Sequence, residues 1–566
     1  MPLPIYFDAY AVINPRVNKH HAAQWSLSHL NMQMQQASIS GALVQSTQSV
    51  LTDPMRGNVN LSQQLTDQPN LLPVWNFLPG GWDESPPAET LPALLRSHNV
   101  RAVTLSPQDN NWSLRSVTSR PLLTALAQSG LPLLLCSDQL KDHAELEWFL
   151  ECFPDWPIVL TSAVWRDQRK VLPMLEAFGN LHLTFDRFQV NLGLEQLVER
   201  GYEDRLLFGT NAPTMSMGAH RTYIDYAQIS DVARQKIAGG NLARLLGVEL
   251  PSPPPDHCGD PLIEAAMHGR PMPTPVIDFH VHVLDEGGNS GGGDSRLYAG
   301  GPTALREHFD RLGVCGANLL SWTGPASCDA VGGNRCLTDA LNKFPDTYWG
   351  APTIDPAHQS LDQMSAQIQR VYADPRMLGM KPYPRYGLWY DHPRYEPWWA
   401  FGEQHRLYAL LHINDYNFEQ VDYVAKRYPN VRWVIAHCGS SFGFADSAIA
   451  LANKYSNVYL EITYTSVYAG IIEYLVAGAG ADRVLYGSDA AMRDPRQQLG
   501  WVVYADPETA IKKNILFHNA LAVIEPCARR LAPIQALVEQ YRGHDCLPLS
   551  EDRVSLAHRS ADTSRA

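Results

Sequence analysis

The sequence predicts an α/β protein made of two tandem (β/α)8 barrels, of which the first is degenerate. The chain has 566 residues, its second half alternates short apolar runs with amphipathic stretches, and parts of that pattern recur in the first half. One barrel of this type needs about 250 residues, so two barrels and a short tail fit the length. We expect the barrels at residues 1–248 and 275–525. A proline-rich linker, 249–274, would join them, and 526–566 would form a partly disordered tail.

The second half carries eight apolar runs that we expect to be strands, at 276–283, 317–322, 348–355, 377–384, 407–415, 431–439, 457–465 and 483–489. Amphipathic stretches lie between them, and those at 360–374 and 418–428 are helix candidates. Eight alternating units are typical of a closed parallel barrel. A doubly wound open sheet is the alternative, but it usually has fewer strands and a glycine-rich first turn, which is absent here.

The first half repeats this pattern more faintly. Four of its segments resemble segments of the second half, in the same order and at similar spacing: 4–15 resembles 275–286, 131–138 resembles 407–414, 153–164 resembles 428–439, and 204–215 resembles 482–493. Matches that keep their order and spacing indicate an internal duplication.

The composition limits the class of protein and its partners. Hydrophobic residues make up 45% of the chain, charged residues 18%, and the formal net charge is -13. This composition is typical of a globular protein, and the negative balance argues against nucleic acid or an anionic membrane as a partner. The cysteines form no C-x-x-C pair, and no signal peptide or membrane-spanning run is evident. We therefore expect a cytoplasmic protein with reduced cysteines and no membrane segment.

Polar side chains occur where several of the predicted strands end. His280 and His282 are two residues apart on the first strand of the second barrel, so both imidazoles face the same side. His412, His437 and Asp489 end its fifth, sixth and eighth strands. The carboxyl ends of the strands meet at the mouth of a parallel barrel, where active sites are built. Imidazole and carboxylate groups suit a divalent metal, Zn most of all, with Mn or Fe as alternatives.

The duplication provides an internal control for this interpretation. A single buried histidine is more often a hydrogen-bonded core residue than a ligand. At the five aligned positions, however, the first half has Ala9, Ala11, Cys136, Ser162 and Asn211, whereas framework residues such as Gly209 and Gly487 match. Packing alone gives no reason for all five to change together. The sequence therefore predicts a metal site kept in the second barrel and lost from the first, which would be catalytically inactive.

The motifs that carry these residues resemble a known family. DFHVH (278–282), LHIND (411–415), AHCGSS (436–441) and YGSD (486–489) are similar to motifs of the amidohydrolase superfamily, in its amidohydrolase-related (amidohydrolase 2) branch. That branch includes aminocarboxymuconate-semialdehyde decarboxylase and related hydrolases and decarboxylases. The resemblance covers the whole second half, and the first half only as a degenerate copy.

The resemblance implies roles for individual residues. His280, His282, His412 and Asp489 would bind one divalent metal, usually Zn. His437 would act as the catalytic base or water-positioning residue, and Asp489 would share in the proton transfer.

Four further residues are candidates for substrate binding. Lys381, on the predicted fourth strand, could bridge two metals, bind a substrate carboxylate or be structural, and analogy favours the substrate. Arg385 and Trp389 lie in the aromatic-rich loop that follows, whose Tyr386, Tyr390 and Trp398 could also wall a pocket or simply pack the loop. Glu461, on the predicted seventh strand, would orient the substrate or Lys381.

The function predicted from these features is that of a metal-dependent hydrolase. Its substrate would be a small amide, ester or lactone, carrying a carboxylate, that is attacked by a metal-activated water. Non-oxidative decarboxylation of an unsaturated or aromatic acid is the first alternative, and a non-catalytic binding or scaffold protein is the second. Because related enzymes often form homodimers, we expect the first barrel to act as an intramolecular partner in a pseudo-dimer; a further homo-oligomer is left open.

Overall fold

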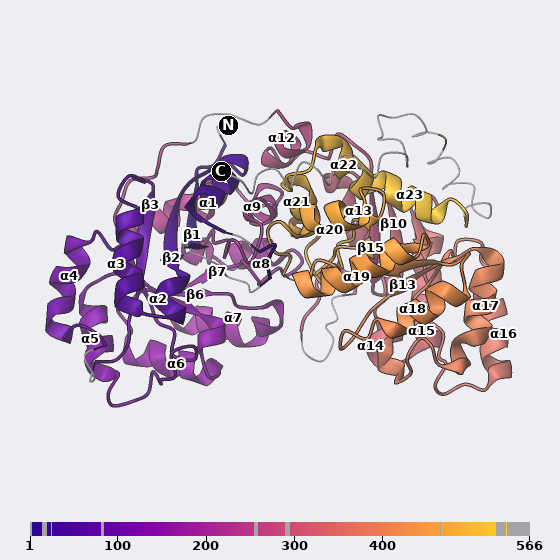
Figure 1. The fold of residues 1–566 in the computed structure, drawn as a ribbon, viewed down its shortest axis with the longest axis horizontal. Helices are drawn as coiled ribbons and strands as arrows, with labels where there is room; N and C mark the ends of the chain where they lie inside the picture. Colours follow the sequence, from indigo (N-terminus) through magenta and orange to yellow (C-terminus); the bar gives the residue numbers. More distant parts are fainter. Residues whose placement is uncertain are drawn as a thin grey trace. The chain divides into compact units, whose positions relative to one another are not determined.

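The computed structural model describes residues 3–13, 20–23, 25–80, 84–253, 259–288, 295–464, 466–527 and 539. The chain divides into two compact units (Figure 1). The first is Met1–Gly259 with Gly293–Arg296, and the second is Asp260–Gly292 with Leu297–Ala566. Each unit is an α/β barrel, and each is described by itself below.

The first unit contains one sheet of eight parallel strands that follow each other in sequence order. They are β1 (Tyr6–Ile13), β2 (Ile39–Ser46), β3 (Leu71–Asn76), β4 (Ala102–Thr104), β5 (Leu133–Cys136), β6 (Ile158–Thr161), β7 (Leu181–Thr184) and β8 (Leu206–Leu207). The last strand returns to the first, because the backbone N–H of Ala9 donates to Phe208 (2.8 Å) and that of Asn211 donates to Tyr10 (2.7 Å). The ring of strands is therefore closed by hydrogen bonds.

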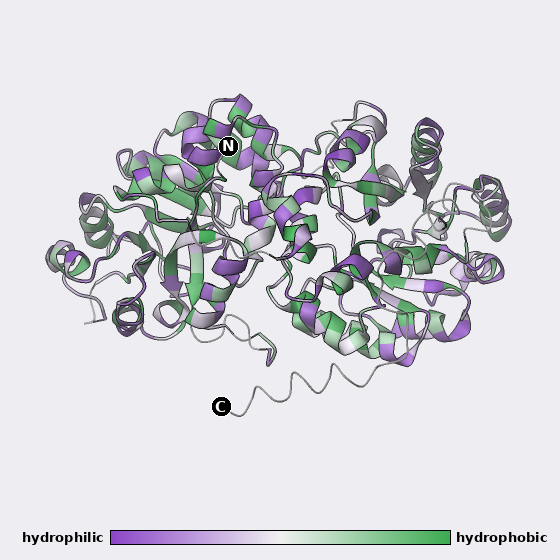
Figure 2. Ribbon diagram, turned by 90° about the horizontal axis from the view of Figure 1, so that it is seen from above, coloured by the Kyte–Doolittle hydropathy of each residue, from purple (hydrophilic) through white to green (hydrophobic). Residues whose placement is uncertain are grey.

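Helices surround this sheet (Figure 1). They are α1 (Leu27–Gln36), α2 (Thr47–Leu51), α3 (Pro54–Gln64), α4 (Leu91–Ser97), α5 (Arg120–Gln128), α6 (His143–Cys152), α7 (Gln168–Ala177), α8 (Gly193–Glu199), α9 (Met217–Asp225), α10 (Asp231–Gln235) and α11 (Asn241–Leu246). The apolar residues of the strands are buried, and Figure 2 shows the strands mainly in the colours of hydrophobic residues. One core cluster joins strand residues such as Phe7, Val74 and Leu207 to Leu242 of α11.

The second unit has eight strands, and each overlaps one of the eight predicted runs. They are β9 (Val276–Val283), β10 (Val314–Ser321), β11 (Tyr348–Gly350), β12 (Gly379–Met380), β13 (Tyr408–Leu411), β14 (Arg432–Ile435), β15 (Val458–Glu461) and β16 (Val484–Leu485). They pair in parallel as two sheets, β11-β10-β9 and β12 to β16. Backbone hydrogen bonds join these sheets, from Leu378 to Gly350 (3.0 Å) and from Asp489 to His280 (2.8 Å). The prediction of two tandem barrels is confirmed, with the second sheet less completely paired than the first.

The helices of the second unit are α12 (Pro261–Met267), α13 (Pro302–Leu312), α14 (Thr323–Ser327), α15 (Ala330–Lys343), α16 (Leu361–Val371), α17 (Glu396–His405), α18 (Glu419–Arg427), α19 (Phe442–Lys454), α20 (Ile471–Ala479), α21 (Pro495–Val503), α22 (Thr509–Lys513) and α23 (Asn519–Ile524). The helices predicted at 360–374 and 418–428 are confirmed as α16 and α18. A capping box between Ser360 and Gln363 begins α16, as the S-x-x-Q pattern favours.

Helix α12 lies inside the segment predicted to be a linker, 249–274. Asp260 caps its N-terminus by accepting from the backbone N–H of Leu262 (2.8 Å). The other carboxylate oxygen of Asp260 accepts from the buried Lys512 ammonium (2.9 Å), which also donates to the carbonyl of Val503 (2.8 Å). The later part of this segment is therefore a folded element of the second unit, whereas 254–258 lie outside the described residues.

The internal duplication extends to individual hydrogen bonds. Each unit has a π-helical turn after its last strand, Lys236–Gly240 in the first and Asn514–His518 in the second. An asparagine follows each turn, and its side-chain amide donates to two backbone carbonyls beside the eighth strand. Asn241 donates to Glu203 and Leu206 (2.6 and 2.9 Å), and Asn519 donates to Ala481 and Val484 (2.8 and 2.7 Å).

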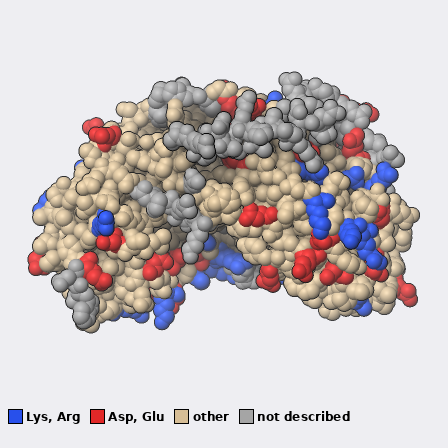
Figure 3. Space-filling model, viewed as in Figure 1, with Lys and Arg blue, Asp and Glu red and all other residues tan. Residues whose placement is uncertain are grey.

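Several predictions made from the sequence are not tested by the fold. Most of the predicted tail at 526–566 lies outside the described residues. The role of the first barrel as an intramolecular partner stays a prediction. Among the described residues, no helix combines the length and the apolar composition needed to cross a membrane. Acidic and basic side chains are interspersed over much of the face seen in Figure 3.

His182 on β7 links the stability of the first unit to pH. Its side chain is buried, and burial, followed by the nearby Arg244 and Arg205, lowers its pKa to about 4. The unfolded chain binds a proton here near pH 6.5 and the folded chain only near pH 4, so stability is lost as the pH falls between these values. We expect the wild type to lose about 2 kcal/mol relative to His182→Leu between pH 7 and pH 5. Urea unfolding of both full-length chains measures this, and an equal stability difference at the two pH values would contradict it.

Candidate metal centre

His280 and His282 project from β9 to the same side of the strand and are both buried. Their ring centroids are 5.4 Å apart. Their Nε2 atoms face one oxygen of Asp489, at 3.7 Å from His280 and 3.3 Å from His282. The three donor atoms lie within 4.8 Å of one another. Two imidazoles and one carboxylate this close form a donor set that fits a divalent cation.

Asp489 lies just beyond β16, where the backbone turns sharply. Its φ of +60° is in the left-handed region, which is unusual for a residue other than glycine. Burial would raise the pKa of its carboxyl, but the imidazoles of His282 and His280 beside it hold that pKa well below the usual range. Burial also lowers the pKa of His280 well below its ordinary value. The carboxylate is therefore ionised and His280 neutral, which are the forms that bind a metal.

His437 and His412 form a hydrogen-bonded pair beside this group. The Nδ1 atom of His437 is 2.7 Å from the carbonyl oxygen of Thr463, which can only accept, so this nitrogen carries the proton. Its Nε2 then accepts from Nδ1 of His412 at 3.0 Å. Burial lowers the pKa of His437 to about 4 and that of His412 well below its ordinary value. Both rings are neutral, and the Nε2 atom of His412 is left without a proton and able to act as a ligand.

Glu461 ends β15 and is fully buried. One carboxylate oxygen lies 3.1 Å from Nδ1 of His280 and accepts from the backbone N–H of His437 (3.4 Å). The other accepts from the backbone N–H of Thr463 (2.6 Å). The donor atoms of Glu461, His280 and His437 also lie within 4.8 Å of one another. Burial raises the pKa of Glu461.

Lys381 follows β12 and is 1% exposed. Its Nζ atom has no hydrogen-bond partner among the described residues and lies 5.9 Å from the ring centroid of Tyr383. Burial lowers its pKa to about 8, against the opposing charges of Asp489 and Glu461. A buried ammonium group without a partner can bind an anionic group.

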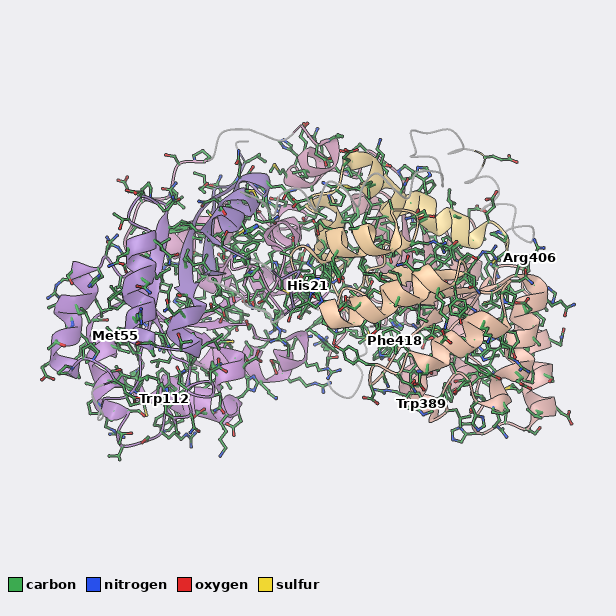
Figure 4. All side chains as sticks on the ribbon, viewed as in Figure 1. His21, Met55, Trp112, Trp389, Arg406 and Phe418 are labelled. Atoms are coloured by element: carbon green, nitrogen blue, oxygen red, sulfur yellow. The ribbon has the colours of Figure 1, made fainter. Side chains whose placement is uncertain are left out.

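The loop after β12 is rich in aromatic residues, which were predicted either to wall a pocket or to pack within the loop. Tyr386, Tyr390 and Trp398 are almost fully buried, so the alternative, that they pack the loop, describes their place in the structure. Arg385 is exposed and donates to the carbonyl of Ala326 (3.0 Å). Trp389, labelled in Figure 4, is 43% exposed. Among the described residues no hydrogen bond or ring contact joins Arg385 or Trp389 to the histidines, and their substrate-binding roles stay predictions.

Three other aromatic rings lie against the histidines. Trp322 is 5.4 Å from His282, Tyr383 is 5.1 Å from His412, and Tyr464 is 5.7 Å from His437, measured between ring centroids. The sequence interpretation missed all three. Each follows within three residues of the end of a strand, β10, β12 or β15, so the rule that located the histidines could have found them.

The same end of the first barrel contains a hydrogen-bonded network in place of a donor cluster. Ser162 donates to Asp186 through its backbone N–H (3.1 Å) and its hydroxyl (2.9 Å), and Asn211 donates to the Ser162 hydroxyl (3.2 Å). Ser162 and Asn211 keep the left-handed backbone, with φ of +58° and +54°, of their counterparts in the second barrel. Among the described residues, both groups of side chains arranged to hold a metal lie in the second unit.

Sequence comparison identifies the family. The sequence profile described as Amidohydrolase matches the chain twice, at residues 40–248 and at residues 277–525. The chain belongs to the amidohydrolase family. Members of this family are metal-dependent hydrolases and decarboxylases, which makes the chain an enzyme of that class. The double match also supports the internal duplication. No curated protein matches the chain.

Three solved structures that resemble part of this chain each correspond to less than half of it. One is 5-carboxyvanillate decarboxylase of Sphingomonas paucimobilis, at 14% identity, with 43% of this chain and 99% of that chain covered and a TM-score of 0.36. A second is 4-oxalomesaconate hydratase of Rhodopseudomonas palustris, at 13% identity, 48% and 100% coverage and a TM-score of 0.37. A third is a dihydroxybenzoic acid decarboxylase of Polaromonas sp. JS666 with bound manganese and the inhibitor 2-nitroresorcinol, at 17% identity, 46% and 99% coverage and a TM-score of 0.35.

Gly487 allows the side chains of the centre to approach the backbone of β16. A Cβ atom added there would lie 2.5 Å from a carboxylate oxygen of Glu461 and 2.8 Å from Cβ of His280. We expect Gly487→Ala to lower the free energy of unfolding by about 1–3 kcal/mol, because both neighbours must shift. Gly443→Ala is the control, since a Cβ there meets no atom within 4 Å. Denaturant unfolding compares the two, and equal stability of both variants would contradict the expectation.

Proposed function

We propose that the second barrel is a metal-dependent hydrolase that acts on a small amide, ester or lactone bearing a carboxylate. The observation that carries this proposal is the convergence of His280 and His282 on one oxygen of Asp489, at 3.7 and 3.3 Å, with the buried ammonium of Lys381 close enough to interact with that carboxylate. The two histidines and Asp489 fit a metal ion, and the Lys381 ammonium fits a negatively charged group of a substrate. Both lie at the carboxyl ends of barrel strands, where barrel enzymes bind their substrates.

His280, His282, His412 and Asp489 would hold the metal, and zinc suits this donor set best, with manganese or iron as alternatives. When bound, the metal would polarise the substrate carbonyl and lower the pKa of a water molecule. His437 would orient that water. Its Nδ1–H donates to the Thr463 carbonyl, so its Nε2 would face the water in exchange for the hydrogen bond that it accepts from Nδ1 of His412. Asp489, which is ionised, would take a proton from that water and then deliver it to the leaving group.

Lys381 would bind the substrate carboxylate. Charge-assisted hydrogen bonds from an ammonium to a carboxylate are strong, and they would supply the partner that the Nζ atom lacks. The rings of Trp322, Tyr383 and Tyr464 are close enough to the histidines to border the same space.

Non-oxidative decarboxylation is the second candidate, and the position of Lys381 favours it too. Because the ammonium is buried near Asp489 and Glu461, a carboxylate held there would lie beside the centre itself. The metal would then orient that carboxylate, and an acid would protonate the carbon that loses CO₂.

Elemental analysis tests the metal site. We expect about one equivalent of a divalent metal per chain, and we expect His280→Ala to lose most of it, because a ligand is removed. The control is His358→Ala, since the side chain of His358 is 70% exposed and its Nδ1 contacts Asp355. Catalytically active protein that contains no metal would contradict the proposed metal-dependent function.

A panel of lactones, esters, amides and unsaturated acids tests the reaction, with proton release and CO₂ release measured in parallel. We expect metal-dependent hydrolysis without CO₂, seen as proton release from the lactones and esters and as release of an amine from the amides. Lys381→Met should raise KM for substrates bearing a carboxylate at least about tenfold, because a charge-assisted contact is lost. The same variant should leave KM nearly unchanged for neutral esters. CO₂ release instead of hydrolysis would establish the second candidate and overturn the first.

A further inference from the structure

Glu461 was predicted to orient the substrate or Lys381, and in the structure its carboxylate oxygens contact other groups of the protein. It contacts an imidazole, His280, and two backbone N–H groups, those of His437 and Thr463. We propose that Glu461 is a positioning residue with two separable tasks. It clamps the ends of β14 and β15 together, and it holds His280 in the orientation that a metal requires. The second task rests on the proposed metal site.

The contact with His280 sets the tautomer of that ring. A carboxylate accepts hydrogen bonds, so Nδ1 of His280, 3.1 Å away, carries the proton. The Nε2 atom is then unprotonated, and it is this atom that faces the Asp489 oxygen at 3.7 Å. Outer carboxylates that hold a histidine in this way fix the ring and make it a better ligand.

The first barrel also has a carboxylate that joins the ends of two neighbouring strands, but within the part of the chain that the structure describes this carboxylate does not hold a histidine. Thr184 stands at the position aligned with Glu461, and the carboxylate comes from Asp186, two residues later. Asp186 accepts from the backbone N–H of Ser162 (3.1 Å), which is the aligned counterpart of His437, and from the Thr184 hydroxyl (2.7 Å). The order Thr-x-Asp in the first barrel is thus reversed to Glu-x-Thr in the second. In the first barrel Ala9 stands at the position of His280, and the Asp186 carboxylate accepts hydrogen bonds from backbone and hydroxyl groups.

The longer side chain of Glu461 needs the space that Gly487 provides. A Cβ added at Gly487 would lie 2.5 Å from the Glu461 carboxylate, whereas a Cβ added at the matching position of the first barrel, Gly209, would lie 2.7 Å from the methyl group of Thr184. Both barrels keep the glycine, but only in the second does a carboxylate fill that space and reach the first strand.

The test exchanges the two arrangements in the full-length chain. The variant Glu461→Thr/Thr463→Asp places the first-barrel order in the second barrel, which keeps a clamp and leaves His280 without its partner. The variant Glu461→Gln keeps the shape and removes the charge. Thr184→Glu/Asp186→Thr, the reverse exchange in the first barrel, is the matched control. Zinc affinity is measured by competition with a chromogenic chelator, and the thermal unfolding midpoint is measured without metal.

We expect both Glu461 variants to lose about 10- to 100-fold in zinc affinity, as is typical when an outer partner of a metal ligand is removed. The unfolding midpoint of Glu461→Gln should fall, because an amide can accept from only one of the two backbone N–H groups that the carboxylate binds. The reverse exchange in the first barrel should keep wild-type zinc affinity. Unchanged zinc affinity in Glu461→Gln would overturn the inference, whether or not the double variant folds. A wild-type chain that binds no zinc, manganese or iron would instead overturn the proposed function, so the two failures are distinguishable.

Discussion

The pairing of β16 with β9 is the constraint on which the rest of the second barrel depends. The backbone N–H of Asp489 donates to the carbonyl of His280, and this bond is one of several that close the ring of strands and bring the Asp489 carboxylate to the two histidines. Asp278 reinforces the closure, because its carboxylate accepts from the backbone N–H of Ser488, 210 residues away in sequence. Burial raises the pKa of Asp278 to about 7. The first barrel closes in the same way, with Asp8 accepting from Thr210.

A comparison of the two barrels distinguishes the features that the fold requires from those that belong to the candidate metal centre. The framework features occur twice: the carboxylate between the first and last strands, the left-handed residue after β6 or β14, and the asparagine after the π-helical turn. Among the described residues, groups of side chains arranged to hold a metal occur only in the second barrel. A backbone that turns through a left-handed residue is therefore a property of this barrel, and His437 and Asp489 use a geometry that Ser162 and Asn211 share.

The site carries a cost that the first barrel avoids. His280 and Lys381 are buried with lowered pKa values, and the Nζ atom of Lys381 and the Nδ1 atom of His282 have no hydrogen-bond partner among the described residues. Buried polar atoms without partners destabilise a fold. In the first barrel the corresponding serine, asparagine and aspartate are bonded to one another. A ligand in the second barrel would supply the missing partners, which is the usual balance between stability and activity at an enzyme site.

The sequence by itself determined the two barrels, their eight-strand rhythm and the convergence of His280, His282 and Asp489, because strand period and parallel topology place strand ends at one mouth. Only the tertiary structure decided the rest. It assigned Glu461 to His280, buried Tyr390 and Trp398 within their loop, and placed Trp322 and Tyr464 beside histidines. These outcomes depend on side-chain directions, on the register between neighbouring strands and on the path of the loops, which no local pattern of residues encodes.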